Sequence, residues 1–230
     1  MSLTTARTLL RQARSVMVLT GAGISAESGI PTFRGAGGLW RNFRPEELAT
    51  PEAFARDPKL VREWYQWRRG VIREAQPNAG HVALAELERR VPEYLLVTQN
   101  VDNLHERAGS SKVTHLHGSI FIDRCIECGR EMTPVPEEHC ACGGWLRPGV
   151  VWFGEPLPEA AWQQAAAAAQ CEVLLVVGTS ALVYPAAALI PQAQACGAKV
   201  IEVNLEETRV SDAVDVSLRG PSARILPELL

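Results

Sequence analysis

Residues 16–26, VMVLTGAGISA, join an apolar run to a glycine turn. The run Val16–Leu19 is typical of a buried parallel strand. Gly21, Gly23 and Ala26 then fit the pattern G-x-G-x-x-G/A, in which missing side chains let the backbone approach a pyrophosphate at a helix N-terminus. Glycines in a strand-to-helix turn also serve plain turn geometry, so this motif alone leaves both interpretations open.

Three further apolar runs end in polar segments. Residues 95–97 lead into TQNVDNLH (98–105), residues 173–177 into GTS (178–180), and residues 199–203 into NLE (204–206). Ligands of open α/β sheets bind beyond the carboxyl ends of the strands. Each segment alone could be a turn or a helix cap, but their recurrence favours a binding site at one edge of a sheet.

Helical patterns alternate with these runs. We expect helices over residues 3–13, 60–75, 80–90 and 159–170, and this alternation predicts a mostly parallel sheet. Residues 33–58 hold three glycines and three prolines, too many for long regular elements. We interpret that stretch as a mobile excursion over a site.

The bulk composition is that of an ordinary globular protein of 230 residues. With 23 basic and 26 acidic side chains the formal net charge is −3, which disfavours direct binding to nucleic acid or to an anionic membrane. The start of the chain lacks the apolar region of a secretory signal, and no apolar run approaches the about 18 residues of a membrane span. We expect a cytoplasmic protein.

Four of the six cysteines lie within one short stretch, in the spacings C-x-x-C and C-x-C: Cys125, Cys128, Cys140 and Cys142. Four thiolates suit tetrahedral zinc and leave no coordination position for water, so the predicted site is structural. His139 is the substitute ligand if one thiol points away, and a disulfide pair or a redox centre remains an alternative. We expect Cys171 and Cys196 to be small core residues.

The combined motifs resemble the sirtuins, a family of NAD-dependent protein-lysine deacylases. The resemblance rests on residues 21–34, 98–105, 117–118, the cysteine quartet, and residues 151–155, 178–180 and 204–206, which occur in the family's order over nearly the whole chain. The chain is similar to the compact bacterial members. Tyr65 and Arg68, in the pattern Tyr-x-x-Arg, and the small residue Ala49 resemble the subgroup that removes succinyl and malonyl groups.

This resemblance implies an α/β fold, with a Rossmann-like parallel sheet, helices on both faces and a small zinc-binding domain. The Rossmann-like domain would be discontinuous, comprising residues 1–32, 78–121 and 146–230. Residues 33–77 would form a flexible cofactor loop and a helical acyl-recognition module, and residues 122–145 the zinc-binding lobe.

The resemblance also implies the site residues. His117 would be the general base, and NAD would be held by Gly21, Ala22, Gly23, Ile24, Ser25, Glu27, Thr32, Phe33, Arg34, Trp40, Gln99, Asn100, Val101, Asp102, Gly178, Thr179, Ser180, Asn204, Leu205, Glu206 and Ser222. Asn100 and Asp102 would form the nicotinamide pocket, over which Phe33 and Arg34 would close. Without the family, a structural role for His117 is at least as plausible as catalysis.

The substrate side of the implied site comprises Ala49, Tyr65, Arg68, Val151, Trp152, Phe153, Gly154 and Glu155. The last five would pair with the substrate backbone as an added strand. Tyr65 and Arg68 are three apart on a predicted helix and share a face, so a phenol and a guanidinium could meet one acyl carboxylate. Without the family, the residues favour a solvated Arg68 and a half-buried Tyr65.

The implied reaction converts acylated lysine and NAD into free lysine, nicotinamide and O-acyl-ADP-ribose. The acyl groups expected are succinyl, malonyl and acetyl. Two alternatives remain at this point, mono-ADP-ribosyl transfer to a protein and a non-catalytic NAD-sensing interaction module. The expected partners are acylated-lysine proteins or peptides, with no nucleic acid and no membrane, and we expect a monomer.

Overall fold

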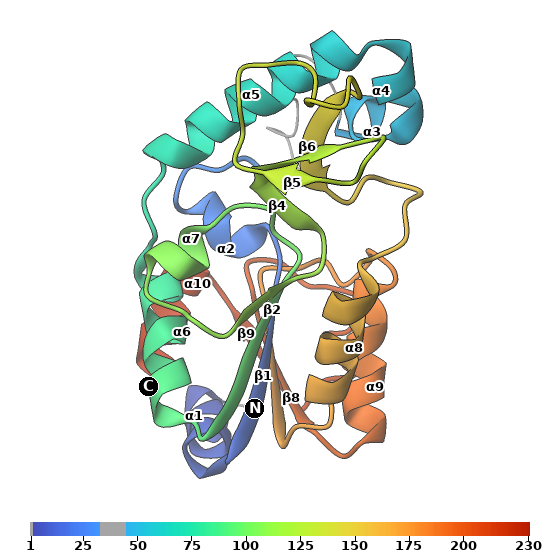
Figure 1. Cartoon of the computed structure of the whole chain (residues 1–230). Coiled ribbons are helices and arrows are strands. Elements are labelled where there is room, and N and C mark those ends of the chain that lie inside the picture. Colours follow the sequence, from blue (N-terminus) through green and yellow to red (C-terminus); the bar gives the residue numbers. More distant parts are fainter. Residues whose placement is uncertain (1, 33–44) are drawn as a thin grey trace.

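A computed structural model describes residues 2–32 and 45–230 of the chain. Its main sheet has six parallel strands in the order β3-β2-β1-β7-β8-β9 (Figure 1). The strands are β1 (Ser15–Thr20), β2 (Glu93–Thr98), β3 (Val113–His115), β7 (Val173–Val177), β8 (Lys199–Asn204) and β9 (Val216–Arg219).

Both faces of this sheet are buried because its central strands are apolar on both sides. In β1, Val16 and Val18 belong to one hydrophobic core, whereas Met17 and Leu19 belong to a second core on the other face. Successive side chains of a strand point to opposite faces, so an uninterrupted apolar run serves both cores. This is the pattern expected of a parallel sheet that is covered by helices.

Helices cover the two faces of the main sheet (Figure 1). One face carries α1 (Leu3–Gln12), α6 (Ala79–Arg90) and α10 (Ser222–Leu229), and the other carries α8 (Glu159–Ala168) and α9 (Leu189–Ala195), the latter preceded by the short 3-10 helix Ala186–Ala188. Two short helices, α2 (Gly23–Ala26) and α7 (Leu104–Arg107), follow β1 and β2. Both lie close to the polar segments that follow these strands at the carboxyl edge of the sheet.

A second, antiparallel sheet has the order β5-β4-β6, formed by β4 (Gly118–Cys125), β5 (Glu131–Met132) and β6 (Leu146–Val150). Against it lie α3 (Pro45–Leu48), α4 (Pro51–Arg56) and the long α5 (Pro58–Glu74). Asp57 caps α5 by accepting from the Leu60 backbone N–H at 3.0 Å. Apolar residues from α5, β4 and β6 form a third core.

Two arginines of α5 clamp that helix onto the small sheet. The Arg69 guanidinium lies 2.5 Å from a carboxylate oxygen of Asp123 on β4, and Arg62 lies 3.7 Å from the other oxygen. Arg62 also donates to the carbonyls of Leu146 and Glu137, at 2.6 and 2.7 Å. All three charges are buried, so they hold each other in place and fix α5 above the cleft described below.

The structure confirms the predicted α/β fold. The apolar runs at 16–19, 95–97, 173–177 and 199–203 lie in β1, β2, β7 and β8, and the four expected helices are α1, α5, α6 and α8. The prediction that Cys171 and Cys196 are both core residues is half wrong: Cys171 is buried, but Cys196 is exposed where it ends α9. Across residues 2–32 and 45–230, no helix has the length and apolar character that a bilayer crossing requires.

Candidate active site

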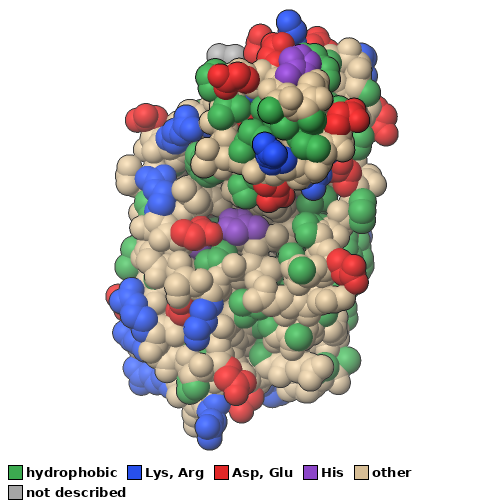
Figure 2. All heavy atoms as spheres, in the orientation of Figure 1, with side chains coloured by type: hydrophobic (Ala, Val, Ile, Leu, Met, Phe, Trp, Pro, Cys, Tyr) green, Lys and Arg blue, Asp and Glu red, His purple; other side chains and the backbone are tan. Residues whose placement is uncertain are grey.

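A cleft of about 670 Å³ lies at the carboxyl edge of the main sheet, between that sheet and the small one. Figure 2 shows one face of the molecule, with a histidine side chain exposed between its upper and lower parts. It is lined by most of the predicted site residues: Gly21, Ala22, Gly23, Glu27, Thr32, Ala49, Tyr65, Arg68, Gln99, Asn100, Val101, His117, Val151, Trp152, Phe153, Gly154, Glu155, Gly178, Thr179, Ser180, Asn204, Leu205, Glu206 and Ser222.

Three glycines bring the ends of β1 and β7 into contact at the floor of this cleft. The Gly23 N–H donates to the Gly178 carbonyl at 2.8 Å, and the Gly21 N–H donates to the Val177 carbonyl at 3.0 Å. A Cβ on Gly23 would lie 2.7 Å from the Gly178 Cα, and Gly178 itself has φ +59°. Packing therefore demands glycine here, and the same absence of side chains exposes backbone to the cleft.

Some predicted cofactor residues lie behind the cleft wall or outside the described residues. Ile24 is fully buried in the first core, and Ser25 and Asp102 are buried behind Asn100. Among the described residues, these three do not line the cleft. Phe33, Arg34 and Trp40 lie outside the residues that the structure describes.

Asn100 is held by a buried hydrogen-bond network. Its side-chain amide donates to the Gly21 carbonyl and to the Ser25 hydroxyl, each at 3.2 Å. Ser25 in turn donates to the Asp102 carboxylate at 3.0 Å, and the Leu104 N–H donates to the other Asp102 oxygen at 3.0 Å. Burial raises the pKa of Asp102, although these two hydrogen bonds act in the opposite direction. The network fixes which face of the Asn100 amide meets the cleft.

A residue that the sequence did not single out completes this network. His81, on α6, accepts the Asn78 N–H on Nδ1 at 3.3 Å, so its proton is on Nε2, which lies 3.4 Å from the Ser25 hydroxyl. Burial lowers the pKa of His81 to about 4, and the ring is therefore neutral at neutral pH. His81 could not be recognised from the sequence, because it belongs to no motif and lies on an ordinary amphipathic helix.

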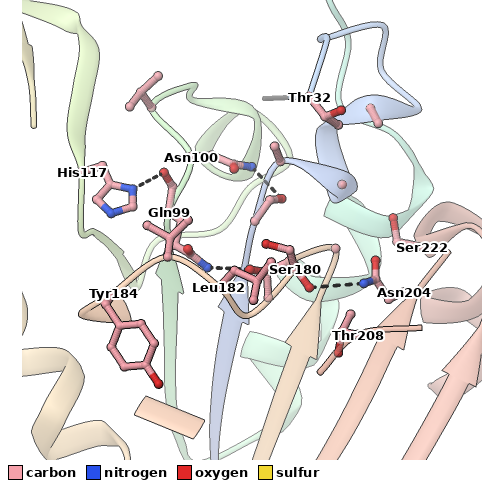
Figure 3. Close-up of a pocket in the computed structure, with 18 of the residues that line it drawn as sticks. Thr32, Gln99, Asn100, His117, Ser180, Leu182, Tyr184, Asn204, Thr208 and Ser222 are labelled. Atoms are coloured by element: carbon pink, nitrogen blue, oxygen red, sulfur yellow. Dashed lines mark hydrogen bonds between the residues drawn. The ribbon is translucent and has the colours of Figure 1, made fainter. Parts of the chain in front are cut away.

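His117 stands at the start of β4 and faces the cleft (Figure 3). Its Nδ1 atom lies 2.8 Å from the Gln99 carbonyl oxygen, and a carbonyl can only accept a hydrogen bond. The proton is therefore on Nδ1, and Nε2 carries the lone pair. Burial lowers the pKa of His117, partly offset by the bond to Gln99. A neutral imidazole with a free lone pair is suited to general-base chemistry.

The segments after β7 and β8 form the far wall of the cleft. The Gln99 side-chain amide donates to the Thr179 hydroxyl at 3.0 Å, and the Asn204 amide donates to the Thr179 carbonyl at 3.2 Å. Leu182, Tyr184 and Thr208 also line this wall (Figure 3). Sequence reasoning missed these three, because they lie in irregular loops that begin beyond the recognised motifs.

Glu27 accepts hydrogen bonds from the Ser222 hydroxyl and from the Ala223 N–H, both at 3.0 Å. It therefore caps the N-terminus of α10, where the first backbone N–H groups lack partners within the helix. Ser222 and Glu27 both remain on the cleft wall. Their mutual bond ties α10 to the turn after β1.

On the opposite side of the cleft, α5 contributes Tyr65 and Arg68. Their side chains are buried, at 1% and 3% exposure, which contradicts the alternative of a solvated arginine and a half-buried tyrosine. The Tyr65 hydroxyl accepts from the Trp152 indole N–H at 2.9 Å, and the Arg68 guanidinium carbon lies 5.4 Å from the Tyr65 ring centroid. Burial raises the pKa of Tyr65 and lowers the pKa of Arg68. The pair places a phenol and a guanidinium at one end of the cleft.

The four clustered cysteines bring their sulfur atoms within 4.8 Å of one another. The sulfurs of Cys125 and Cys142 are 3.5 Å apart and those of Cys128 and Cys140 are 3.8 Å apart. A tetrahedral zinc with Zn–S bonds of about 2.3 Å places its sulfurs about 3.8 Å apart, so the donor set fits zinc. His139 is not in the cluster found among the described residues, and its ring packs on Trp145 with centroids 4.2 Å apart.

Residues 21–185 match the Sir2 family. The chain is 53% identical over 229 residues to NAD-dependent protein deacylase 2 of Pyrobaculum aerophilum, covering 96% of this chain and 92% of that protein. It is 57% identical over 213 residues to the NAD-dependent protein deacylase of Aquifex aeolicus, covering 89% of each.

Solved structures agree with these relatives. The chain superposes on a Sir2 homolog–NAD complex with a TM-score of 0.93 at 47% identity, over 98% of this chain and 91% of that one. A Sir2–p53 peptide–NAD+ complex gives a TM-score of 0.90 at 32% identity, over 100% and 97%. With the glycine junction, the His117 site and the cysteine cluster in the order and places described above, this chain belongs to the Sir2 family.

Proposed function

We propose that the chain is an NAD-dependent protein-lysine deacylase that acts on succinyl-, malonyl- and acetyl-lysine. The observation that carries the proposal is the placement of His117. This residue lines a cleft whose floor is formed by glycines and whose wall includes Gln99 and Asn100, and its Nε2 atom carries the lone pair. The names of the relatives in Pyrobaculum and Aquifex support the same activity.

The glycine junction and the loops after β7 and β8 would hold NAD. Gly21, Ala22 and Gly23 offer backbone to a pyrophosphate at the start of α2, and Thr179, Ser180 and Asn204 offer hydrogen-bonding groups to the adenosine half. When bound, NAD supplies an electrophilic ribose carbon, which accepts the acyl oxygen as nicotinamide departs. Asn100, whose amide orientation is fixed by Ser25 and Gly21, would hold the nicotinamide amide.

His117 would remove a proton from a ribose hydroxyl through Nε2. The bond from Nδ1 to the Gln99 carbonyl orients the ring and keeps the base on the cleft side. Because burial lowers the pKa of His117, the ring is unprotonated and ready to act at neutral pH. The apolar wall contributed by Val101, Val151 and Leu182 would keep water from the ribose carbon, where it would hydrolyse NAD. One water would be consumed only later, when free lysine and O-acyl-ADP-ribose are released.

An acylated-lysine peptide would enter as an added strand along residues 151–155. Hydrogen bonds already order that segment: the Phe153 N–H donates to the Ala49 carbonyl at 3.0 Å, and the Trp152 N–H donates to the Glu155 carboxylate at 2.8 Å. Recognition through backbone hydrogen bonds is largely indifferent to sequence. We therefore expect several protein substrates.

The acyl preference rests on Tyr65 and Arg68. A guanidinium and a phenol that are both removed from bulk water interact more strongly with a carboxylate than exposed groups do. A succinyl or malonyl group carries such a carboxylate and an acetyl group does not. The small side chain of Ala49, also on the cleft wall, leaves room for the longer acyl chain.

The proposal includes five features of the whole protein. Residues 1–32, 78–121 and 146–230 would act as the NAD-binding domain, residues 33–77 as the acyl-recognition module and residues 122–145 as the zinc lobe. Zinc bound by the four cysteines would be structural. The protein would act in the cytoplasm as a monomer, which light scattering coupled to gel filtration can test, and would not bind nucleic acid.

Turnover of matched acetyl- and succinyl-lysine peptides, with and without NAD, tests the activity. Nicotinamide release should require an acylated peptide, and O-acyl-ADP-ribose should accumulate with it. Arg68→Met should abolish turnover of the succinyl peptide and leave turnover of the acetyl peptide measurable. Equal loss of both activities would contradict the proposed acyl preference. Modified protein instead of O-acyl-ADP-ribose would identify a mono-ADP-ribosyltransferase, and NAD binding without any turnover would identify a sensing module.

A further inference from the structure

The indole ring of Trp152 is held by two side chains, Arg147 and Phe54. The Arg147 guanidinium carbon lies 3.3 Å from the centroid of the ring, and the Phe54 ring packs 5.3 Å away, centroid to centroid. Arg147 also forms a two-pronged ion pair with Glu155, at 2.5 and 2.9 Å, while Glu155 accepts the backbone N–H of Trp152. The ring therefore has one well-defined position in the wall of the cleft.

This position directs the only polar atom of the indole at the Tyr65 hydroxyl. The distance from Trp152 Nε1 to the Tyr65 oxygen is 2.9 Å, and both side chains are buried. An indole N–H can only donate, so the phenol oxygen is the acceptor in this bond. One lone pair of Tyr65 is thereby occupied, and the hydroxyl hydrogen of Tyr65 must point away from Trp152.

We infer that Trp152 is a positioning residue for acyl specificity, whose indole N–H commits the Tyr65 hydroxyl to donate toward the carboxylate of a dicarboxylic acyl group. The inference rests on the proposed function, because it concerns the acyl group of that substrate. A phenol that is free to rotate can present either its hydrogen or a lone pair to the cleft. Only the hydrogen attracts a carboxylate, whereas a lone pair repels it.

The geometry of α5 supports this assignment. Tyr65 and Arg68 are one turn apart on the helix, both line the cleft, and Arg68 lies 5.4 Å from the Tyr65 ring. The positive charge of Arg68 therefore lies beside the Tyr65 side chain at the same end of the cleft. An acyl carboxylate would meet two donors there, while an acetyl group would use neither.

A double-mutant cycle on Trp152→Phe and Tyr65→Phe tests the inference. The measured quantity is the ratio of kcat/KM for succinyl-lysine peptide to that for the matched acetyl-lysine peptide. Because a hydrogen bond to a charged group is involved, each single variant should lower this ratio by about tenfold. In the Tyr65→Phe background, Trp152→Phe should change the ratio less than about twofold, because no hydroxyl remains to be positioned.

A matched control is available in the same aromatic cluster. Trp145 also packs on Phe54, with ring centroids 6.4 Å apart, but it is not the residue bonded to Tyr65. Trp145→Phe removes an indole from that cluster and should leave the ratio unchanged. If Trp152→Phe proves unstable in thermal unfolding, benzothienylalanine at position 152 keeps the ring shape and removes only the N–H, and it should lower the ratio in the same way.

The outcomes separate this inference from the proposed function. If the wild-type protein does not turn over succinyl peptide with NAD, the proposed acyl preference fails and the inference fails with it. If wild type is active and Arg68→Met abolishes succinyl turnover, but the effects of Trp152→Phe and Tyr65→Phe multiply in the double variant, only the role of Trp152 is overturned. A fall in the ratio caused by Trp145→Phe would also overturn it.

Discussion

The Nδ1 atom of His117 donates a hydrogen bond to the carbonyl oxygen of Gln99 at 2.8 Å. This bond settles the tautomer of the ring, since the carbonyl has no proton to give. It also joins the end of β2 to the start of β4, and so to the small sheet. Nε2, the nitrogen that we propose as the base, is thus placed by a contact between the two halves of the cleft.

The first prediction concerns the pH dependence of turnover. The base must be unprotonated, and burial lowers the pKa of His117, so activity should persist to lower pH than with an ordinary histidine. In a profile of kcat/KM for acetyl peptide against pH, we expect the midpoint of the decline on the acid side to lie below about pH 6.5. A midpoint above that value would contradict the assignment.

A variant separates the base from the hydrogen bond that orients it. His117→Asn keeps an amide donor that can face the Gln99 carbonyl, but it has no lone pair of sufficient basicity. Turnover should fall by at least about 100-fold, while NAD binding measured by calorimetry should remain. Retention of most of the activity would show that another group serves as the base.

The second prediction concerns the glycine junction. Gly178→Ala places a side chain at φ +59°, where the new Cβ would also collide with the Ile24 backbone nitrogen. The free energy of unfolding should fall by more than about 1 kcal/mol, and NAD affinity should fall with it because the turns after β1 and β7 must separate. Denaturant unfolding and NAD titration measure the two effects.

Gly70 provides the control for this change. It lies inside α5, and a Cβ there meets no atom within 4 Å. Gly70→Ala should stabilise the protein by about 0.5–1 kcal/mol, since glycine is a poor residue for an exposed helix interior. Equal effects of the two alanine substitutions would show that the junction imposes no special constraint.

The third prediction concerns the buried charges that hold α5. Asp123 is fully buried between Arg69 and Arg62, so Asp123→Ala leaves two guanidinium groups without their carboxylate. We expect a loss of about 3–5 kcal/mol in the free energy of unfolding. Lys59→Ala, which breaks an exposed ion pair with Glu138, should cost less than about 1 kcal/mol. Similar small losses from both variants would mean that the clamp is dispensable.

The elements of this fold that the sequence predicts are those with short, contiguous residue patterns. The runs in β1, β2, β7 and β8 are apolar on both faces, and the glycines and the paired cysteines have fixed local spacings. The edge strands β3 and β9 were not predicted, since each is short and only partly buried. Helix α10 was also not predicted, and Pro227 lies within it.

The part of the site that sequence reasoning missed depends on pairs that are distant in the chain. Asp123 meets Arg69 across 54 residues, and Trp152 meets Tyr65 across 87. Asp102 was expected to line the pocket with Asn100, but it lies behind it, bonded to Ser25. Neighbouring residues in an irregular turn can point to different layers, and only the folded backbone decides which layer each side chain reaches.

The last prediction concerns the metal. Cys125 ends β4 and pairs in register with Leu146, which begins β6. A zinc ion bound by Cys125, Cys128, Cys140 and Cys142 would therefore hold together the end of β4 and the start of β6. Chelation should unfold the segment between them and lower turnover, because β4 carries both His117's neighbour Gly118 and the clamp residue Asp123. Metal analysis and circular dichroism follow the two changes.

Single substitutions distinguish the zinc-binding cysteines from the other cysteines. Cys142→Ser should reduce the zinc content and the thermal stability together, because a neutral hydroxyl replaces a thiolate ligand. Cys196→Ser, at an exposed position at the end of α9, should change neither. Zinc would have no structural role if metal-free protein kept both its circular dichroism spectrum and its full turnover. It would be catalytic if added metal restored activity to a protein that had remained folded throughout. The four cysteines are not among the described residues that line the cleft. We therefore expect a structural zinc, whose removal abolishes fold and activity together and whose return restores both.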